Sequence, residues 1–137
     1  MADELTDVFA ISASALKAQN QRMKVIAENI ANANTTASGP GQKPYQRQVL
    51  TFKNEFDKAL GAYKVKVNGV HADGSEPIKK FDPSNPAADP QGYVMMPNVN
   101  PLVEMIDMTD ANRAYQANLN VIDASRNMLL KTLALLQ

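Results

Sequence analysis

Few residues in this sequence could carry chemistry, and their spacing fits neither catalysis nor metal binding. His71 is the only histidine and lies beside a turn, where a solvated imidazole explains it better than a general base. The carboxylates of Asp73, Glu76 and Asp82 lack the regular spacing of oxygen ligands in a calcium-binding loop. The glycines form neither a dinucleotide-binding motif nor a P-loop. We therefore expect no catalytic residue, no metal site and no cofactor.

A second group of acidic residues, Glu104, Asp107 and Asp110, recurs at helical spacing. The group follows Asn100 and Pro101, which favour a helix start because asparagine can cap the first turn and proline suits the first helical position. Carboxylates near a helix N-terminus interact favourably with the helix dipole. We interpret the three acids as compensating that dipole rather than as a ligand cluster.

Two long helices are predicted at the ends of the chain, because apolar residues recur there at seven-residue intervals. Seven residues are close to two helical turns, so each series lies on one face. We expect the first helix to run from residues 3–7 to about 33 and the second from 101 to 136. Such long faces in a short chain predict an assembly seam that neighbouring chains cover. The front series is Phe9, Leu16, Met23 and Ile30 with Ile26 beside it, and the back series is Met108, Tyr115, Ile122, Leu129 and Leu136 with Leu133 beside it.

The middle of the chain carries no helical pattern, and six of the eight prolines lie between residues 77 and 101. Residues 45–52 and 63–67 have the β-branched and aromatic content of strands, and turns are expected at residues 68–69, 73–74 and 89–92. The sequence predicts a mainly α fold with a small β insertion. Its long N- and C-terminal helices would pair as an antiparallel coiled-coil-like hairpin around a proline-rich, short-stranded middle region. The expected divisions are an N-terminal helix over 1–36, a loop and small β region over 37–100, and a C-terminal helix over 101–137.

The overall composition argues against several classes of partner. The 137 residues contain 14 basic and 14 acidic side chains, so no positive surface for nucleic acid is predicted. The chain has no cysteine, which excludes disulfides and thiolate metal sites. No apolar run reaches the roughly 20 residues that span a bilayer, and the first seven residues include three acids where a secretory signal would be positive. We expect no direct membrane insertion, and either a cytoplasmic location or export without a cleaved signal.

Two segments carry motifs of a known family. The first spans residues 27–36 and resembles the N-terminal signature of bacterial flagellar axial proteins, which are the rod, hook and hook-associated subunits. The second spans residues 92–118 and resembles the C-terminal part of the proximal rod proteins within that family. The resemblance covers nearly the whole chain. The motif residues are Asn29, Ala31, Asn32 and Thr35 in the first segment, and Tyr93, Pro97, Asn98, Val99, Asn100, Glu104, Met105, Arg113, Tyr115, Gln116, Ala117 and Asn118 in the second.

The resemblance implies a structural subunit of the bacterial flagellar basal body. Such a subunit polymerises in the proximal rod, the driveshaft that transmits torque to the hook and filament. The implied partners are other rod proteins and copies of the same chain in a helical rod and, in transit, the flagellar type III export apparatus. The implied location is the periplasmic rod, reached without a cleaved signal peptide.

The alternative is a soluble helical adaptor or a type III secretion chaperone, because a hairpin of long helices would also serve such a protein. A chaperone is more often acidic and lacks a proline-rich insertion. An enzyme, the third class, would need a convergent polar site that the sequence does not show. The genomic neighbourhood distinguishes these classes, since rod, ring and export genes alongside would favour the rod subunit.

Overall fold

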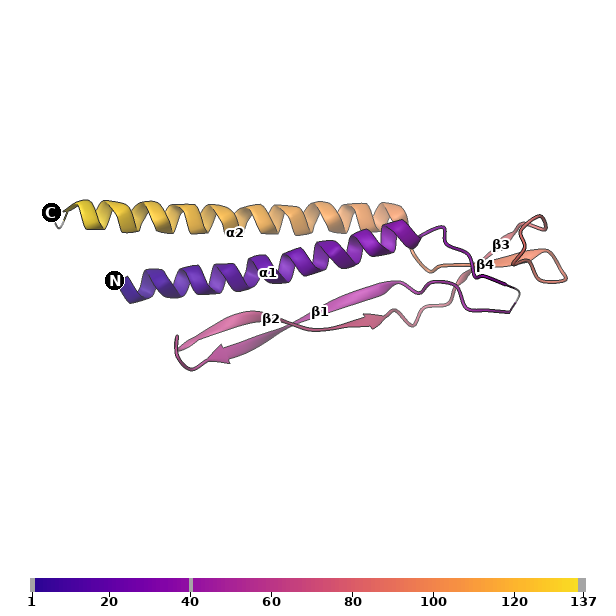
Figure 1. Ribbon diagram of the computed structural model, residues 1–137, viewed down its shortest axis with the longest axis horizontal. Helices are drawn as coiled ribbons and strands as arrows, with labels where there is room; N and C mark the ends of the chain where they lie inside the picture. Colours follow the sequence, from indigo (N-terminus) through magenta and orange to yellow (C-terminus); the bar gives the residue numbers. More distant parts are fainter. Residues whose placement is uncertain (1, 40, 136–137) are drawn as a thin grey trace. The chain divides into compact units, whose positions relative to one another are not determined.

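The computed structural model describes residues 2–39 and 41–135 (Figure 1). Two long helices and two small antiparallel sheets make up the fold, so the predicted terminal helices with a small β insertion are confirmed, in a chain that is roughly half helical. The antiparallel coiled-coil pairing of the helices stays a prediction. The elements in chain order are α1 (Ala2–Asn32), β1 (Gln48–Asp57), β2 (Ala62–Ala72), β3 (Ile78–Phe81), β4 (Tyr93–Met96) and α2 (Pro101–Leu135).

The helix α1 ends where the sequence replaces strong helix formers with turn-forming residues. The Ala33 N–H donates to the Ile30 carbonyl at 3.2 Å, and the Thr35 N–H donates to the Asn32 carbonyl at 3.0 Å. These bonds satisfy carbonyls that a helix C-terminus would otherwise leave without donors. The predicted end near residue 33 is confirmed.

The helix α2 begins with the cap that the sequence predicts. The side-chain oxygen of Asn100 accepts a hydrogen bond from the Leu102 N–H at 3.1 Å, and Pro101 is the first helical residue. The Asn100 carbonyl then accepts the first helical bond, from the Glu104 N–H at 3.1 Å. The helix continues to Leu135, so the seam position Leu136 lies outside the described residues. Neither helix, over its described length, is apolar enough to cross a membrane.

The strands β1 and β2 form a longer hairpin than the sequence predicts. The strand expected over 45–52 instead begins at Gln48 and continues to Asp57, and β2 continues past residue 67 to Ala72. The predicted turn at Asn68 and Gly69 is therefore wrong, because both residues lie inside β2.

The turn of the first hairpin lies at residues 58–61 instead. The Asp57 carboxylate accepts the Ala59 N–H at 2.9 Å, and Gly61 adopts a positive φ of 63°. Glycine occupies that left-handed region without the steric cost that other residues meet. Two cross-strand ion pairs, Lys64 with Asp57 at 2.6 Å and Lys66 with Glu55 at 2.9 Å, support the added length.

The strands β3 and β4 form a second, shorter hairpin (Figure 1), in which Ile78 pairs with Met96 and Phe81 with Tyr93. The predicted turn at residues 89–92 is confirmed, since the Gly92 N–H donates to the Asp89 carbonyl at 2.9 Å. One face of this hairpin is buried at Val94.

The chain divides into two compact units. One comprises the described residues of 1–23, 51–69 and 109–137, and the other comprises 24–50 and 70–108 without residue 40. In the first unit, the buried positions are small residues, as expected for a chain with only 6% aromatic residues. In the second unit, the buried residues include apolar side chains and two polar ones, Asn29 and Glu104, and these two belong to the candidate site. The buried small residues of the first unit are Ser12, Ala18, Ala111 and Ser125.

Candidate functional site

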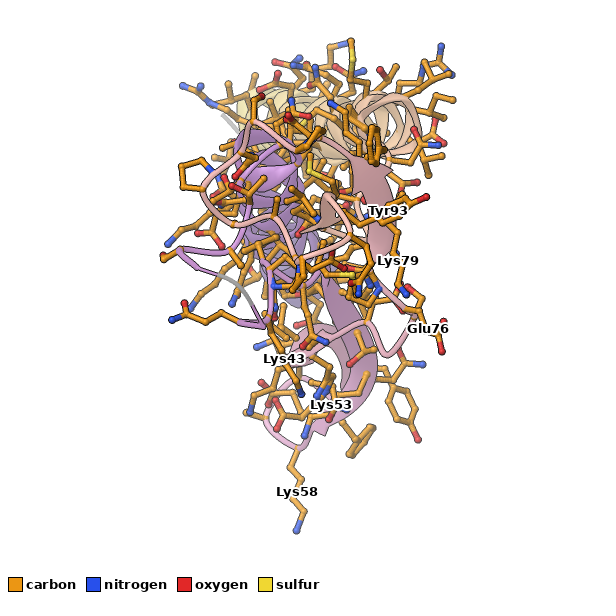
Figure 2. All side chains as sticks on the ribbon, turned by 90° about the vertical axis from the view of Figure 1, so that its right-hand side faces the viewer. Lys43, Lys53, Lys58, Glu76, Lys79 and Tyr93 are labelled. Carbon is orange, nitrogen blue, oxygen red and sulfur yellow. The ribbon has the colours of Figure 1, made fainter. Side chains whose placement is uncertain are left out.

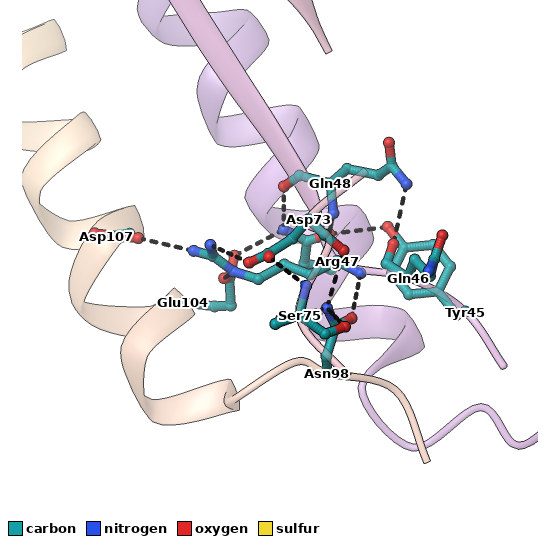
Figure 3. A network of polar contacts seen from close by, with 10 residues as sticks. Tyr45, Gln46, Arg47, Gln48, Asp73, Ser75, Asn98, Glu104 and Asp107 are labelled. Atoms are coloured by element: carbon teal, nitrogen blue, oxygen red, sulfur yellow. Dashed lines mark hydrogen bonds and ion pairs between the residues drawn. The ribbon is translucent and has the colours of Figure 1, made fainter. Parts of the chain in front are cut away.

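The site is built around Glu104, whose side chain lies in the first turn of α2 and is completely buried, at 0% exposure. One carboxylate oxygen accepts a hydrogen bond from Nε of Arg47 at 2.6 Å (Figure 3), and the other accepts one from Nδ2 of Asn29 at 3.0 Å. A buried carboxylate costs several kcal/mol unless it is paired and hydrogen-bonded. Glu104 therefore ties the start of α2 to the end of α1 and to the segment before β1, all within the unit of residues 24–50 and 70–108.

Asn29 connects α1 to the start of β1. It is 1% exposed, and its amide makes four hydrogen bonds. Its Nδ2 donates to the Gln48 carbonyl at 2.8 Å as well as to Glu104, and its Oδ1 accepts the Gln48 N–H at 2.8 Å and the Tyr45 hydroxyl at 2.9 Å. The amide thus bonds both backbone groups of Gln48, as a neighbouring strand would. Because hydrogen bonds depend on distance and angle, these four bonds hold the end of α1 and the start of β1 in one relative position.

Arg47 is the cation of the site, and its guanidinium contacts three carboxylates. Besides Glu104, it approaches Asp73 at 3.5 Å through Nη1 and Asp107 at 3.6 Å through Nη2. Its side chain is largely buried, and the hydrogen bond to Glu104 raises the pKa of Arg47 above its ordinary value. Three acids around one guanidinium keep the arginine charged and fix its planar fork in place.

Asn98 and Ser75 complete the site from the loops. The side-chain oxygen of Asn98 accepts the Arg47 N–H at 2.8 Å, and its amide nitrogen donates to the Ser75 hydroxyl at 2.7 Å (Figure 3). The Asp73 N–H donates to the Arg47 carbonyl at 2.7 Å, which closes the base of the β1–β2 hairpin. The Ser75 N–H donates to the Asp73 carboxylate at 3.0 Å, and this bond lowers the pKa of Asp73. We name the whole set the polar clamp: Asn29, Tyr45, Arg47, Gln48, Asp73, Ser75, Asn98, Glu104 and Asp107.

The side chains of the polar clamp bind one another and hold chain segments together. Burial raises the pKa of Tyr45, so its phenol remains a hydrogen-bond donor. Within the described ranges, no three carboxylate or histidine side chains are placed to hold a metal ion. The acids of the polar clamp are instead engaged by Arg47, by Asn29 and by backbone N–H groups. The arrangement is that of a structural junction.

The sequence did not reveal this junction. Dipole compensation by Glu104, Asp107 and Asp110 stays a prediction, and it is incomplete: Glu104 and Asp107 also form ion pairs with Arg47, whereas Asp110 pairs locally with Arg113 at 3.7 Å. Arg47 is 57 positions from Glu104, so local spacing could not pair them. One signal was present, since Arg47 is the single arginine between positions 22 and 113.

The family-motif residues fall into several structural roles. Asn29, Asn98 and Glu104 meet in the polar clamp, Asn100 caps α2, and Pro97 and Val99 are buried beside it. The others lie outside the polar clamp. Asn32 and Thr35 close the end of α1, Asn118 donates to the Ala114 carbonyl within α2, Tyr115 is half-buried, and Ala31, Tyr93, Met105, Arg113, Gln116 and Ala117 are exposed.

The predicted seam residues are mostly half-buried in the single chain. Among those that the structure describes, only Ile26 is buried, while Leu133 is 51% exposed. The fully buried positions of α2 are instead Glu104, Ala111 and Ser125, which lie on the same helical face as the back series. The half-buried seam residues are Phe9, Leu16, Met23 and Ile30 on α1 and Met108, Tyr115, Ile122 and Leu129 on α2.

The chain is similar to known flagellar proteins along almost its entire length. Residues 9–37 match the family described as flagella basal body rod protein, and residues 91–135 match the C-terminal family of the flagellar basal body rod FlgEFG proteins. The flagellar basal-body rod protein FlgC of Agrobacterium fabrum is 44% identical over 98% of this chain and 97% of its own. The FlgC protein of Escherichia coli O6:H1 is 40% identical over 96% and 97%, and that of Bacillus subtilis is 36% identical over 90% and 92%.

Proposed function

Because the chain belongs to the FlgC family of flagellar basal-body rod proteins, we propose that it polymerises in the proximal rod, the periplasmic driveshaft that transmits torque to the hook and filament. It is a structural subunit of the flagellar basal-body rod and assembles there with other rod proteins. We prefer this role to that of a helical adaptor or a type III secretion chaperone, since the relatives are rod proteins.

The observation that carries the mechanical part of the proposal is the buried Glu104 of the polar clamp. A driveshaft subunit must keep the angles between its segments when torque is applied. The polar clamp binds the end of α1, the start of β1, the loop after β2 and the start of α2 through Glu104, Asn29 and Arg47. Buried, fully satisfied polar networks resist distortion because each bond depends on distance and angle.

The half-buried apolar series on α1 and α2 are the proposed assembly seam. In the single chain their side chains keep part of their apolar surface in water, as at Leu133 and Leu16. Neighbouring subunits, both copies of this chain and other rod proteins, would remove that surface and stabilise the helices by mass action. On this proposal, residues 1–36 and 101–137 form the axial core and residues 37–100 form the insertion.

The route to the rod is the last part of the proposal. A subunit whose terminal helices gain order only on assembly can pass the flagellar type III export apparatus as an extended chain, without a cleaved signal. The polar clamp then forms after export, because all of its bonds except that between Ser75 and Asp73 join residues that are 16 to 75 positions apart in sequence.

Complementation of a strain that lacks this gene tests the proposal. Glu104→Gln should reduce the number of rods in isolated basal bodies, because a glutamine amide nitrogen would face a donor, either Nε of Arg47 or Nδ2 of Asn29. Glu28→Gln is the matched control, since Glu28 is exposed on α1 and its 4.0 Å ion pair with Lys24 contributes little. Normal rods in the deletion strain would refute the rod function itself. Normal rods and swimming with Glu104→Gln would refute the mechanical role of the polar clamp.

A further inference from the structure

The strand β3 has one edge that β4 does not use. The strands pair antiparallel with Lys80 opposite Val94, and the Asp82 N–H donates to the Gly92 carbonyl at 2.9 Å just beyond them. In an antiparallel ladder, hydrogen-bonded and non-hydrogen-bonded pairs alternate. The bonded pairs are therefore 82/92, 80/94 and 78/96. The backbone N–H and C=O groups of Lys79 and Phe81 then point away from β4.

The outer edge of β4, by contrast, is closed by the chain itself at Tyr93. The Tyr93 N–H donates to the Asp89 carboxylate at 2.9 Å, and the Tyr93 carbonyl accepts the Asp89 N–H at 2.9 Å. Nothing comparable covers β3 in the described part of the chain, where all four of its residues are exposed. In the described part of the chain, the edge of β3 is therefore open at both Lys79 and Phe81, whereas that of β4 is closed at Tyr93.

The face beside this edge carries aromatic rings that are held in place. Phe81 and Tyr93 lie on one face in edge-to-face contact, with centroids 5.3 Å apart, yet they are 62% and 45% exposed. Gly92 permits this, because a Cβ at its position would lie 2.9 Å from the Phe81 ring, and its φ of 84° suits glycine. Rigid exposed aromatic groups contribute much binding energy at protein interfaces.

The same face continues into a groove. Met95 pairs with Lys79 across the hairpin, and it also lines a groove of about 430 Å³ together with Pro44 and Pro77. Pro77 directly precedes β3, so the groove extends the open edge at its N-terminal end. Figure 2 shows the labelled side chains of Lys79 and Tyr93 on one side of the molecule.

The charge of the edge indicates its partner. Lys79 and Lys80 are both exposed on β3, and exposed lysines also protect strand edges from unwanted pairing. Protection alone does not explain the exposed, preorganised rings of Phe81 and Tyr93. An acidic extended segment would satisfy the backbone groups, the lysines and the rings together.

A second copy of this chain is a poor source of such a segment. Outside the helices, all of its acidic side chains except Glu76 already have a partner within the chain. The engaged acids are Glu55 with Lys66, Asp57 with Lys64, Asp73 with Arg47, Asp82 with Ser84, and Asp89 with the N–H groups of Gln91 and Tyr93.

We propose that the open edge of β3 accepts an acidic, extended segment of a different rod protein as an added strand, with Phe81 and Tyr93 packing against its side chains. The inference rests on the proposed rod function and names one contact within it. The added strand would run along Lys79 and Phe81 toward the groove beside Pro77.

A single proline substitution in β3 tests the backbone contact. Lys79→Pro removes an N–H that points outward and leaves the β3–β4 ladder intact, so the isolated subunit should fold. Lys79→Ala removes the charge and keeps the N–H. We expect Lys79→Pro to give about tenfold fewer rods than Lys79→Ala in complemented cells. Lys58→Pro, in the exposed turn of the other hairpin, is the control and should assemble normally. Equal rod numbers for Lys79→Pro and Lys79→Ala would overturn the added strand.

A second measurement identifies the partner and does not depend on a proline variant. A benzophenone amino acid at position 81 of the full chain, in cells that assemble rods, should crosslink to an extended segment rich in Asp or Glu on a different rod protein. A crosslink to a helix, to a second copy of this chain or to no protein would overturn the proposal. Rods that persist without the gene would refute the rod function, whereas rods that need the gene but tolerate Lys79→Pro refute only the added strand.

Discussion

Replacing Arg47 with methionine isolates the energetic role of the polar clamp. Methionine has a similar length and no charge, so Arg47→Met leaves the carboxylate of Glu104 fully buried with Asn29 as its remaining hydrogen-bond donor. Breaking a buried ion pair by removing one partner costs about 3–5 kcal/mol, because a charge is left uncompensated. The side chain of Arg47 is 24% exposed, so water can reach part of the vacated site. We therefore expect the lower part of that range, about 3 kcal/mol.

Two companion variants give the ranking that identifies the cause. Glu104→Gln removes the charge from the buried end, while Arg47 keeps Asp73 and Asp107 nearby. It should cost about 1.5–3 kcal/mol, the range for a lost hydrogen bond to a charged group. The double variant, Arg47→Met with Glu104→Met, replaces the pair with apolar side chains, and such replacements are often neutral or stabilising. The double variant should therefore be more stable than Arg47→Met.

Urea unfolding of the purified full chain, followed by circular dichroism and tyrosine fluorescence, measures these differences. Two of the four tyrosines, Tyr45 and Tyr93, lie in the unit that contains the pair, so part of the fluorescence change reports on that unit. The expected order of stability places the original chain above Glu104→Gln, and Arg47→Met lowest. A double variant less stable than Arg47→Met would refute the reasoning, because it would mean that the lost stability does not come from the unpaired charge.

Further predictions concern the cap of α2, the stability of the fold at low pH and the order of the helices in the monomer. Asn100→Ala should cost about 1 kcal/mol because it removes the cap on α2, whereas Pro101→Ala should be nearly neutral; thermal dissociation of isolated basal bodies compares them. The pKa of Asp73 is lowered from its ordinary value of 3.8, so this carboxylate stabilises the fold at pH values above 3.8, and that stabilisation is lost as the pH falls through the folded pKa. Asp73→Asn should therefore flatten the low-pH part of a curve of stability against pH. Amide exchange on the monomer should show little protection in 1–23 and 109–135 and more in residues 24–50; uniform protection would contradict the need for neighbours.

The helices were predictable from sequence because their signals are local. The seven-residue series and the Asn100-Pro101 start each depend on neighbours within a few positions, and α2 begins at the predicted residue. The first hairpin was less predictable. An Asn-Gly pair at 68–69 is a common turn, but the alternating strand continues through it, and the turn lies at 58–61. Cross-strand pairs such as Lys66 with Glu55 accompany the longer strands, and only the folded chain brings them together.

The polar clamp was not predictable for a different reason. Its members are short polar residues that sequence patterns assign to caps, turns and solvent. In the sequence, Asn29 looks like a solvent-exposed polar residue of an amphipathic helix. Glu104 looks like any acidic residue in the first turn of a helix. Their burial results from contacts made 75 positions apart, through the 3.0 Å bond that joins them. Long-range hydrogen bonds of this kind leave no periodic trace in the sequence.

The comparison between stability and assembly then separates two explanations for a buried ion pair in a rod subunit. If Glu104 and Arg47 serve stability, the apolar double variant should restore both unfolding free energy and rods, since buried apolar pairs can equal ionic ones. If they serve geometry, the double variant should unfold like the original chain and still assemble poorly, because methionine side chains repack in several ways. The four directional bonds of Asn29, which bind both backbone groups of Gln48, favour geometry. We therefore expect restored stability without restored rods, and full recovery of rods in the double variant would argue against a geometric role for the polar clamp.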